Sequence, residues 1–110
     1  MLNVRLYLLQ RISAFILAPL VLLHLGVMIV AIQGGLDSAE ILSRTQGSVL
    51  WAAVYGLFVV TVSIHAAIGL RVVMFEWLGI RGRTLDVLGW LAFLVLLFMG
   101  LLAVIAVTVT

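Results

Sequence analysis

The chain has 110 residues, of which 66% are hydrophobic and only 9% are charged. Because soluble domains carry about 25% charged residues, too few polar side chains are present to cover a water-facing surface. The net charge of +2 is too small and too scattered for a nucleic-acid surface, and the absence of cysteine excludes disulfides, thiolate metal sites and c-type haem attachment. The composition therefore predicts an integral membrane protein.

Three apolar stretches follow one another along the chain, at about residues 12–33, 48–73 and 87–109. Each has the roughly 20 residues that a helix needs to cross about 30 Å of hydrocarbon. Backbone groups in lipid must pair within their own segment, so each stretch is expected to be helical, and Pro19 in the first is compatible with a membrane helix. The sequence predicts a single all-α transmembrane domain over residues 1–110.

The two connections between these stretches are short. Residues 34–47 include residues 37–40, Asp-Ser-Ala-Glu, which have the spacing of a capping box and predict a short surface helix. Residues 74–86 contain the helix breakers Gly79 and Gly82. No repeat or water-soluble domain is expected.

The arginines predict how the chain is oriented. Five of the six fall on one side if there are three crossings: Arg5, Arg11, Arg71, Arg81 and Arg83. The positive-inside rule then places the N-terminus and the second connection in the cytoplasm, or its mitochondrial equivalent, and the C-terminus outside. The expected location is a bacterial cytoplasmic (inner) membrane. Trp77 and Trp90 are expected at the inner interface, and Trp51 and Tyr55 near the outer one, as in an aromatic belt.

Two histidines, His24 and His65, lie within the apolar stretches. Counted from the inner edges of these stretches at about 1.5 Å per residue, His65 is about 12 Å deep and His24 about 18 Å deep. Ionisable groups at this depth are costly and suggest function, and an imidazole nitrogen is a good ligand for a b-type haem. The simpler alternative is that both histidines are packed as interhelical hydrogen-bond donors.

Arg11 and Arg71 are candidates to pair with haem propionates or to donate a hydrogen bond to a quinone carbonyl. The alternative for both is that they extend to lipid phosphates. Beside His65, the small residues Ala66, Ala67 and Gly69 would let another helix or a flat macrocycle approach closely.

Residues 65–76 read His-Ala-Ala-Ile-Gly-Leu-Arg-Val-Val-Met-Phe-Glu. This run resembles the second-helix motif of the cytochrome b membrane-anchor subunits of succinate dehydrogenase: His, three residues, Gly, an aliphatic, Arg, a hydrophobic stretch and an Asp. Residues 11–13, Arg-Ile-Ser, look like the family's Arg-x-Ser/Thr at the start of the first helix. The resemblance implies that His65 is an axial ligand of haem b and that Arg11 lies near the ubiquinone site and the haem propionates.

The chain departs from the family pattern at several positions. Val72 replaces a His or Phe, Glu76 replaces the Asp, and Gln10 replaces the His before the first-helix Arg. The family's quinone-binding Ser corresponds to Tyr7, and a quinone-binding Tyr of the partner anchor subunit corresponds to Trp77. These changes leave open which of the two anchor subunits the chain resembles more.

The resemblance implies a non-catalytic, haem b-binding subunit in the respiratory chain and the tricarboxylic acid cycle. It would form half of a six-helix anchor bundle with a second three-helix subunit, and would dock a flavoprotein and an iron–sulfur subunit. Ubiquinone or menaquinone would be reduced near the inner interface. The implied site residues are His65 at the haem iron, Arg71 at a propionate, His24 at a tentative second haem, and Arg11, Trp77, Ser13 and Tyr7 at the quinone.

Other functions are compatible with parts of the sequence. A quinol:fumarate reductase would use the same anchor in the reverse direction. A small assembly subunit without redox chemistry would need its histidines only for packing. A transport subunit is less well supported, because the apolar stretches contain one proline and no buried acid.

Overall fold

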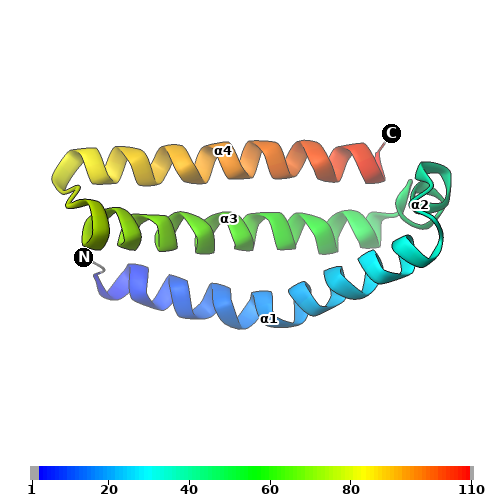
Figure 1. The fold of residues 1–110 in the computed structure, drawn as a ribbon, viewed down its shortest axis with the longest axis horizontal. Coiled ribbons are helices and arrows are strands. Elements are labelled where there is room, and N and C mark those ends of the chain that lie inside the picture. Colours follow the sequence, from blue (N-terminus) through cyan, green and yellow to red (C-terminus); the bar gives the residue numbers. More distant parts are fainter. Residues whose placement is uncertain (1–2, 110) are drawn as a thin grey trace.

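The computed structural model describes residues 3–109, which form four helices (Figure 1). In chain order these are α1 (Val4–Gln33), α2 (Ser38–Thr45), α3 (Val49–Leu78) and α4 (Gly82–Thr108). The helices α1, α3 and α4 are long and apolar enough to cross a membrane, which confirms the predicted all-α transmembrane architecture.

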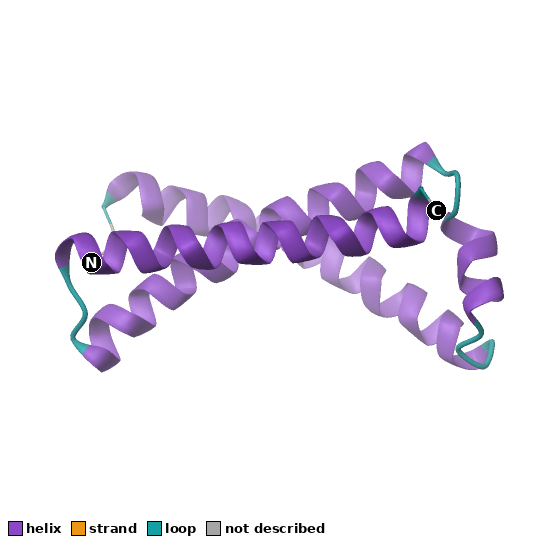
Figure 2. Ribbon diagram, turned by 90° about the horizontal axis from the view of Figure 1, so that it is seen from above, coloured by secondary structure: helices purple, strands orange, loops and turns teal. Residues whose placement is uncertain are grey.

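The central helix is α3, which packs against both α1 and α4. The long helices cross near their middles and diverge toward their ends (Figure 2). Among residues 3–109, Ser63 of α3 is the most deeply buried side chain, 1% exposed, and many large apolar side chains of all three long helices point outward. This outward-facing apolar surface is expected where lipid takes the place of water as the solvent.

The long helices extend beyond the apolar stretches that predict them. Asn3 caps α1 by accepting a 2.9 Å hydrogen bond from the backbone N–H of Leu6, so this helix begins well before residue 12. At the other connection, α3 continues to Leu78 and ends at Gly79, whose φ of 70° is left-handed. The connection predicted over residues 74–86 is therefore much shorter, because polar residues outside the hydrocarbon remain helical.

The short helix α2 forms where the capping-box spacing predicts it. The side chain of Asp37 accepts a 3.2 Å hydrogen bond from the N–H of Ala39 at the start of α2. Glu40 forms a 2.6 Å ion pair with Arg44 one turn later. The carboxylate of Glu40 therefore supports the body of α2 through an i,i+4 pair.

A second set of hydrogen bonds connects α2 to the end of α4. The buried hydroxyl of Thr45 donates a hydrogen bond to the carbonyl oxygen of Val107 at 2.7 Å. The backbone N–H of Gly47 donates to the carbonyl oxygen of Thr108, also at 2.7 Å. The last carbonyl groups of a helix have no partner within the helix. The segment that follows α1 thus caps the C-terminal end of α4.

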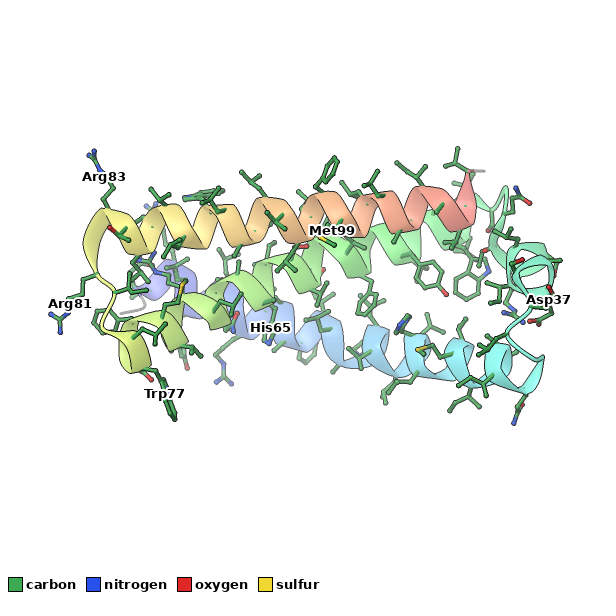
Figure 3. All side chains as sticks on the ribbon, turned by 45° about the horizontal axis from the view of Figure 1, so that its top comes forward. Asp37, His65, Trp77, Arg81, Arg83 and Met99 are labelled. Atoms are coloured by element: carbon green, nitrogen blue, oxygen red, sulfur yellow. The ribbon has the colours of Figure 1, made fainter. Side chains whose placement is uncertain are left out.

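The two ends of the bundle differ in charge. The start of α1 and the connection between α3 and α4 lie at one end, whereas α2 and the end of α4 lie at the other (Figure 1). Arg81 and Arg83 extend from the first end, and Asp37 lies at the second (Figure 3). We call the end that carries Arg5, Arg81 and Arg83 the arginine end. The sequence-based pairing of the N-terminus with the second connection is confirmed.

Candidate functional site

His65 is hydrogen-bonded to Ser13 across the interface between α3 and α1 (Figure 3 labels the histidine). The distance from His65 Nδ1 to Ser13 Oγ is 3.1 Å. Ser13 is 4% exposed, and its hydroxyl also donates to the carbonyl oxygen of Gln10 at 2.9 Å. His65 itself is half-buried. One edge of the imidazole ring is thus held by α1.

The contact between Ser13 and His65 also sets the relative heights of the two histidines. His24 lies eleven residues beyond Ser13 on α1, which is about 16 Å along a helix. Counting from the ends of the apolar stretches separated the two histidines by only about 6 Å at the same rise per residue. That estimate is too small because α1 starts earlier than its apolar stretch and lies against α3 in a register that hydropathy does not reveal.

His24 lies among aromatic rings. Its ring centroid is 5.1 Å from that of Phe58 and 6.4 Å from that of Tyr55, the latter in an edge-on arrangement. The Nδ1 atom of His24 is buried and has no hydrogen-bond partner among residues 3–109. The two histidines therefore have different surroundings: His65 has a polar partner for Nδ1, whereas His24 is packed between rings.

Arg11 and Tyr7 form a separate pair one turn apart on α1. Arg11 Nη1 lies 3.4 Å from the Tyr7 hydroxyl, and the guanidinium lies 5.7 Å from the centroid of the phenol ring. Both side chains are exposed. Arg11 and Ser13 are two residues apart, which corresponds to a rotation of about 200° around the helix axis. Arg11 therefore faces away from the side of α1 on which Ser13 contacts His65.

Arg71 is paired with Asp86, a residue that belongs to none of the sequence motifs. Arg71 Nη1 lies 2.6 Å from Asp86 Oδ1, which joins α3 to the first turns of α4. Arg71 follows His65 by six residues and lies about 120° around the helix from it. The structure therefore does not bring Arg71 to His65. The available signal for Asp86 was an acid directly before the third apolar stretch, on the side of the membrane where the second stretch ends near Arg71.

A groove at the arginine end has a volume of about 550 Å³ and is lined by all three long helices. It contains Arg5, Arg71, Asp86 and the ring of Trp90, with apolar side chains along its walls. His65 does not line it. The groove thus occupies a face of the bundle different from the one that carries the Ser13–His65 contact.

Trp77 stands alone near the end of α3. It is 81% exposed and points away from the bundle (Figure 3). Within residues 3–109 it makes no hydrogen bond with Arg11, its predicted neighbour at a quinone. At the opposite end of α3, Trp51 and Tyr55 stack with their ring centroids 5.3 Å apart. The aromatic side chains are therefore placed toward both ends of the bundle, as in an aromatic belt.

The amino-acid sequence matches one protein-family model. Residues 2–108 match the model described as succinate dehydrogenase/fumarate reductase transmembrane subunit. The match covers nearly the whole chain and includes both histidines and all six arginines. Comparisons with curated proteins and with solved structures gave no significant match.

Proposed function

Because the chain belongs to the succinate dehydrogenase/fumarate reductase transmembrane subunit family, we propose that it is the haem b-binding membrane-anchor subunit of a succinate dehydrogenase. In this role it forms half of a six-helix bundle with a second anchor subunit. Together the two subunits hold the flavoprotein and iron–sulfur subunits at the membrane. The chain itself is not catalytic, and its residues help to form the quinone-reduction site.

The surroundings of His65 support its role as an axial ligand of haem b. Its Nδ1 atom is occupied by Ser13, whereas its Nε2 atom makes no hydrogen bond with any residue from 3 to 109. A neutral imidazole binds iron through one nitrogen while the other nitrogen is held by a hydrogen bond. When bound, haem b supplies one-electron redox chemistry at its iron. This geometry is the observation that carries the proposal.

The second axial ligand would come from the partner anchor subunit. The chain has only two histidines, and His24 lies about 16 Å along α1 from the level of His65. One haem cannot span that separation with both histidines. His24 is therefore a candidate only for a second haem nearer the opposite end of the bundle.

Arg11 and Tyr7 are the strongest candidates to hold the quinone. They are adjacent, exposed and near the arginine end of α1, and they offer guanidinium N–H and phenol O–H donors. Ubiquinone or menaquinone presents two carbonyl oxygens as acceptors. The indole N–H of Trp77 is a third donor at the same end. Because these side chains are exposed on the single chain, the partner subunit would enclose the quinone.

The propionates of the haem need cations. Arg11 forms no ion pair with residues 3–109, but it faces away from the side of α1 on which Ser13 contacts His65. Arg71 is a weaker candidate, because Asp86 already accepts from its guanidinium and it lies on a different face of α3 from His65. Ser13 is better assigned to His65 than to the quinone, because its hydroxyl is buried against the imidazole.

The arginine end would lie in the cytoplasm of a bacterium, with the protein in the cytoplasmic membrane. Arg81 and Arg83 extend from this end (Figure 3), Arg5 lies in the first turn of α1 at the same end, and such an excess of arginine favours the cytoplasmic side. The flavoprotein and iron–sulfur subunits would dock there. The same anchor would serve a quinol:fumarate reductase, which is the principal alternative; an assembly subunit without redox chemistry is the second.

The haem assignment is tested on the purified complete complex. We expect a reduced-minus-oxidised spectrum of a b-type haem that is lost in His65→Ala. Thr61→Val is the matched control, because Thr61 is buried one turn earlier on α3 and its hydroxyl bonds only to the Leu57 carbonyl oxygen. An unchanged haem spectrum in His65→Ala would refute the assignment.

The quinone assignment is tested by separating two activities of the complex. Arg11→Ala should slow quinone reduction while electron transfer from succinate to soluble dyes stays at the wild-type rate. Arg83→Ala is the control, because it removes an exposed arginine at the same end. Wild-type rates of both activities in Arg11→Ala would show that Arg11 only contacts lipid.

A further inference from the structure

We propose that Ser13 is a positioning residue that selects the tautomer of His65 and so leaves its Nε2 atom available to iron. This inference rests on the proposed haem function and assigns a specific part of it to α1. The observations that carry it are the 3.1 Å contact between Ser13 Oγ and His65 Nδ1 and the 2.9 Å hydrogen bond from Ser13 to the Gln10 carbonyl oxygen.

The number of protons on Ser13 and His65 determines which of the two donates the hydrogen bond between them. A serine hydroxyl has one proton to donate and accepts through its lone pairs. If Ser13 donates to the Gln10 carbonyl oxygen, its oxygen can only accept from His65, so Nδ1 must carry the imidazole proton. The chain of donors then runs from His65 Nδ1–H to Ser13 Oγ–H and on to Gln10. The Nδ1 proton, the Ser13 hydroxyl and the Gln10 backbone carbonyl oxygen then each have a partner.

The opposite direction is less favourable. If the Ser13 hydroxyl donated to Nδ1, the imidazole proton would reside on Nε2. That N–H would have no acceptor among residues 3–109, and no lone pair would remain at Nε2 for a metal. The first direction makes two hydrogen bonds, one to Ser13 Oγ and one to the Gln10 carbonyl oxygen, whereas the second makes only the one to Nδ1. The hydrogen bonds present in the structure therefore favour the tautomer that an axial ligand requires.

The burial of Ser13 makes its role hard to replace. At 4% exposure, its hydroxyl is sealed between α1 and α3, so water has little access to take its place. A hydrogen bond from Nδ1–H makes the imidazole a stronger electron donor and fixes the plane of its ring. A stronger donor stabilises ferric over ferrous iron. Ser13 is thus expected to lower the midpoint potential of the haem.

The test measures the midpoint potential of the haem in the purified complex by a redox titration of its optical signal. Ser13→Ala removes the acceptor and should shift the potential to a more positive value. Ser13→Thr keeps a hydroxyl that can bond the same carbonyl, and should return the potential to near that of the wild type. Ser63→Ala is the control: its hydroxyl is also buried, but it donates to the Val59 carbonyl oxygen rather than bonding to His65.

A wild-type potential in Ser13→Ala would overturn the inference. An equal shift in Ser63→Ala would also overturn it, because any lost buried hydroxyl would then have this effect. If Ser13→Ala does not assemble, Ser13→Cys replaces it, because a thiol is a weak acceptor of similar size. Ser13→Cys should give a smaller positive shift, and an unchanged potential would refute the proposal. The haem assignment itself fails separately, through His65→Ala.

Discussion

The guanidinium of Arg71 and the carboxylate of Asp86 lie 2.6 Å apart and connect α3 to α4 at the arginine end. The two side chains are unequally covered, 21% exposed for Arg71 and 58% for Asp86. The charge of Arg71 therefore depends more on the ion pair for its stabilisation than the charge of Asp86 does. Arg71 and His65 lie on two different faces of α3. Arg71 faces α4 and the groove, whereas His65 faces α1.

Asp86→Asn should lower the thermal stability of the complex modestly. The lost attraction is worth about 1 kcal/mol or less, because the carboxylate is more than half exposed and water screens it. Arg71→Gln and the double variant complete a double-mutant cycle, read from the midpoint of thermal unfolding. Arg83→Gln is the control, since Arg83 forms no ion pair with residues 3–109. Additive effects of the two single changes would show that the pair contributes nothing.

Gly100→Ala should destabilise the contact between α3 and α4. A Cβ atom at this position would lie 2.5 Å from Val59 Cγ1, so Val59 or one of the helices must move. Overpacking of this kind typically costs about 1–3 kcal/mol. Thermal unfolding of the complex measures the loss of stability. Adding Val59→Ala to the same chain should restore most of the lost stability.

Gly56→Ala is the matched control for Gly100, because nothing lies within 4 Å of a Cβ atom placed there. Alanine is a better helix former than glycine, so this change should be neutral or slightly stabilising. Equal unfolding temperatures for the Gly100→Ala and Gly56→Ala complexes would contradict the close approach of α3 and α4.

His24→Phe should leave the number of haems per complex unchanged. His24 contacts the rings of Phe58 and Tyr55, and phenylalanine can preserve this aromatic packing. Its Nδ1 atom also lacks the hydrogen-bond partner that His65 has. Haem content is measured as the pyridine haemochrome relative to protein. Loss of one haem from the variant would assign His24 to a second haem.

Single cysteines should report which end of the bundle faces the cytoplasm. The chain contains no cysteine, so each introduced thiol is unique within it. In intact cells, Ser43→Cys on the exposed surface of α2 should react with a membrane-impermeant maleimide, and Arg83→Cys should react only after lysis. The reverse pattern of labelling would invert the topology.

Much of the fold could be predicted from sequence because it depends on local and solvent-driven effects. The lengths of the apolar stretches predict the spanning helices, and the spacing of Asp37 and Glu40 predicts α2. The helix ends were less predictable, since hydropathy detects where lipid begins but not where backbone hydrogen bonding stops. Val4 and Leu78 extend their helices past the apolar stretches for this reason.

By itself, the sequence determined the class of protein and the presence of three spanning helices, and it singled out His65 as a candidate haem ligand, since hydropathy and a motif within one helix are local properties. Only the tertiary structure decided the partners of the polar side chains. Ser13 and His65 are 52 residues apart, and Arg71 and Asp86 are 15 apart. Which of these groups meet depends on the register and rotation of each helix against its neighbour, and side-chain packing sets both.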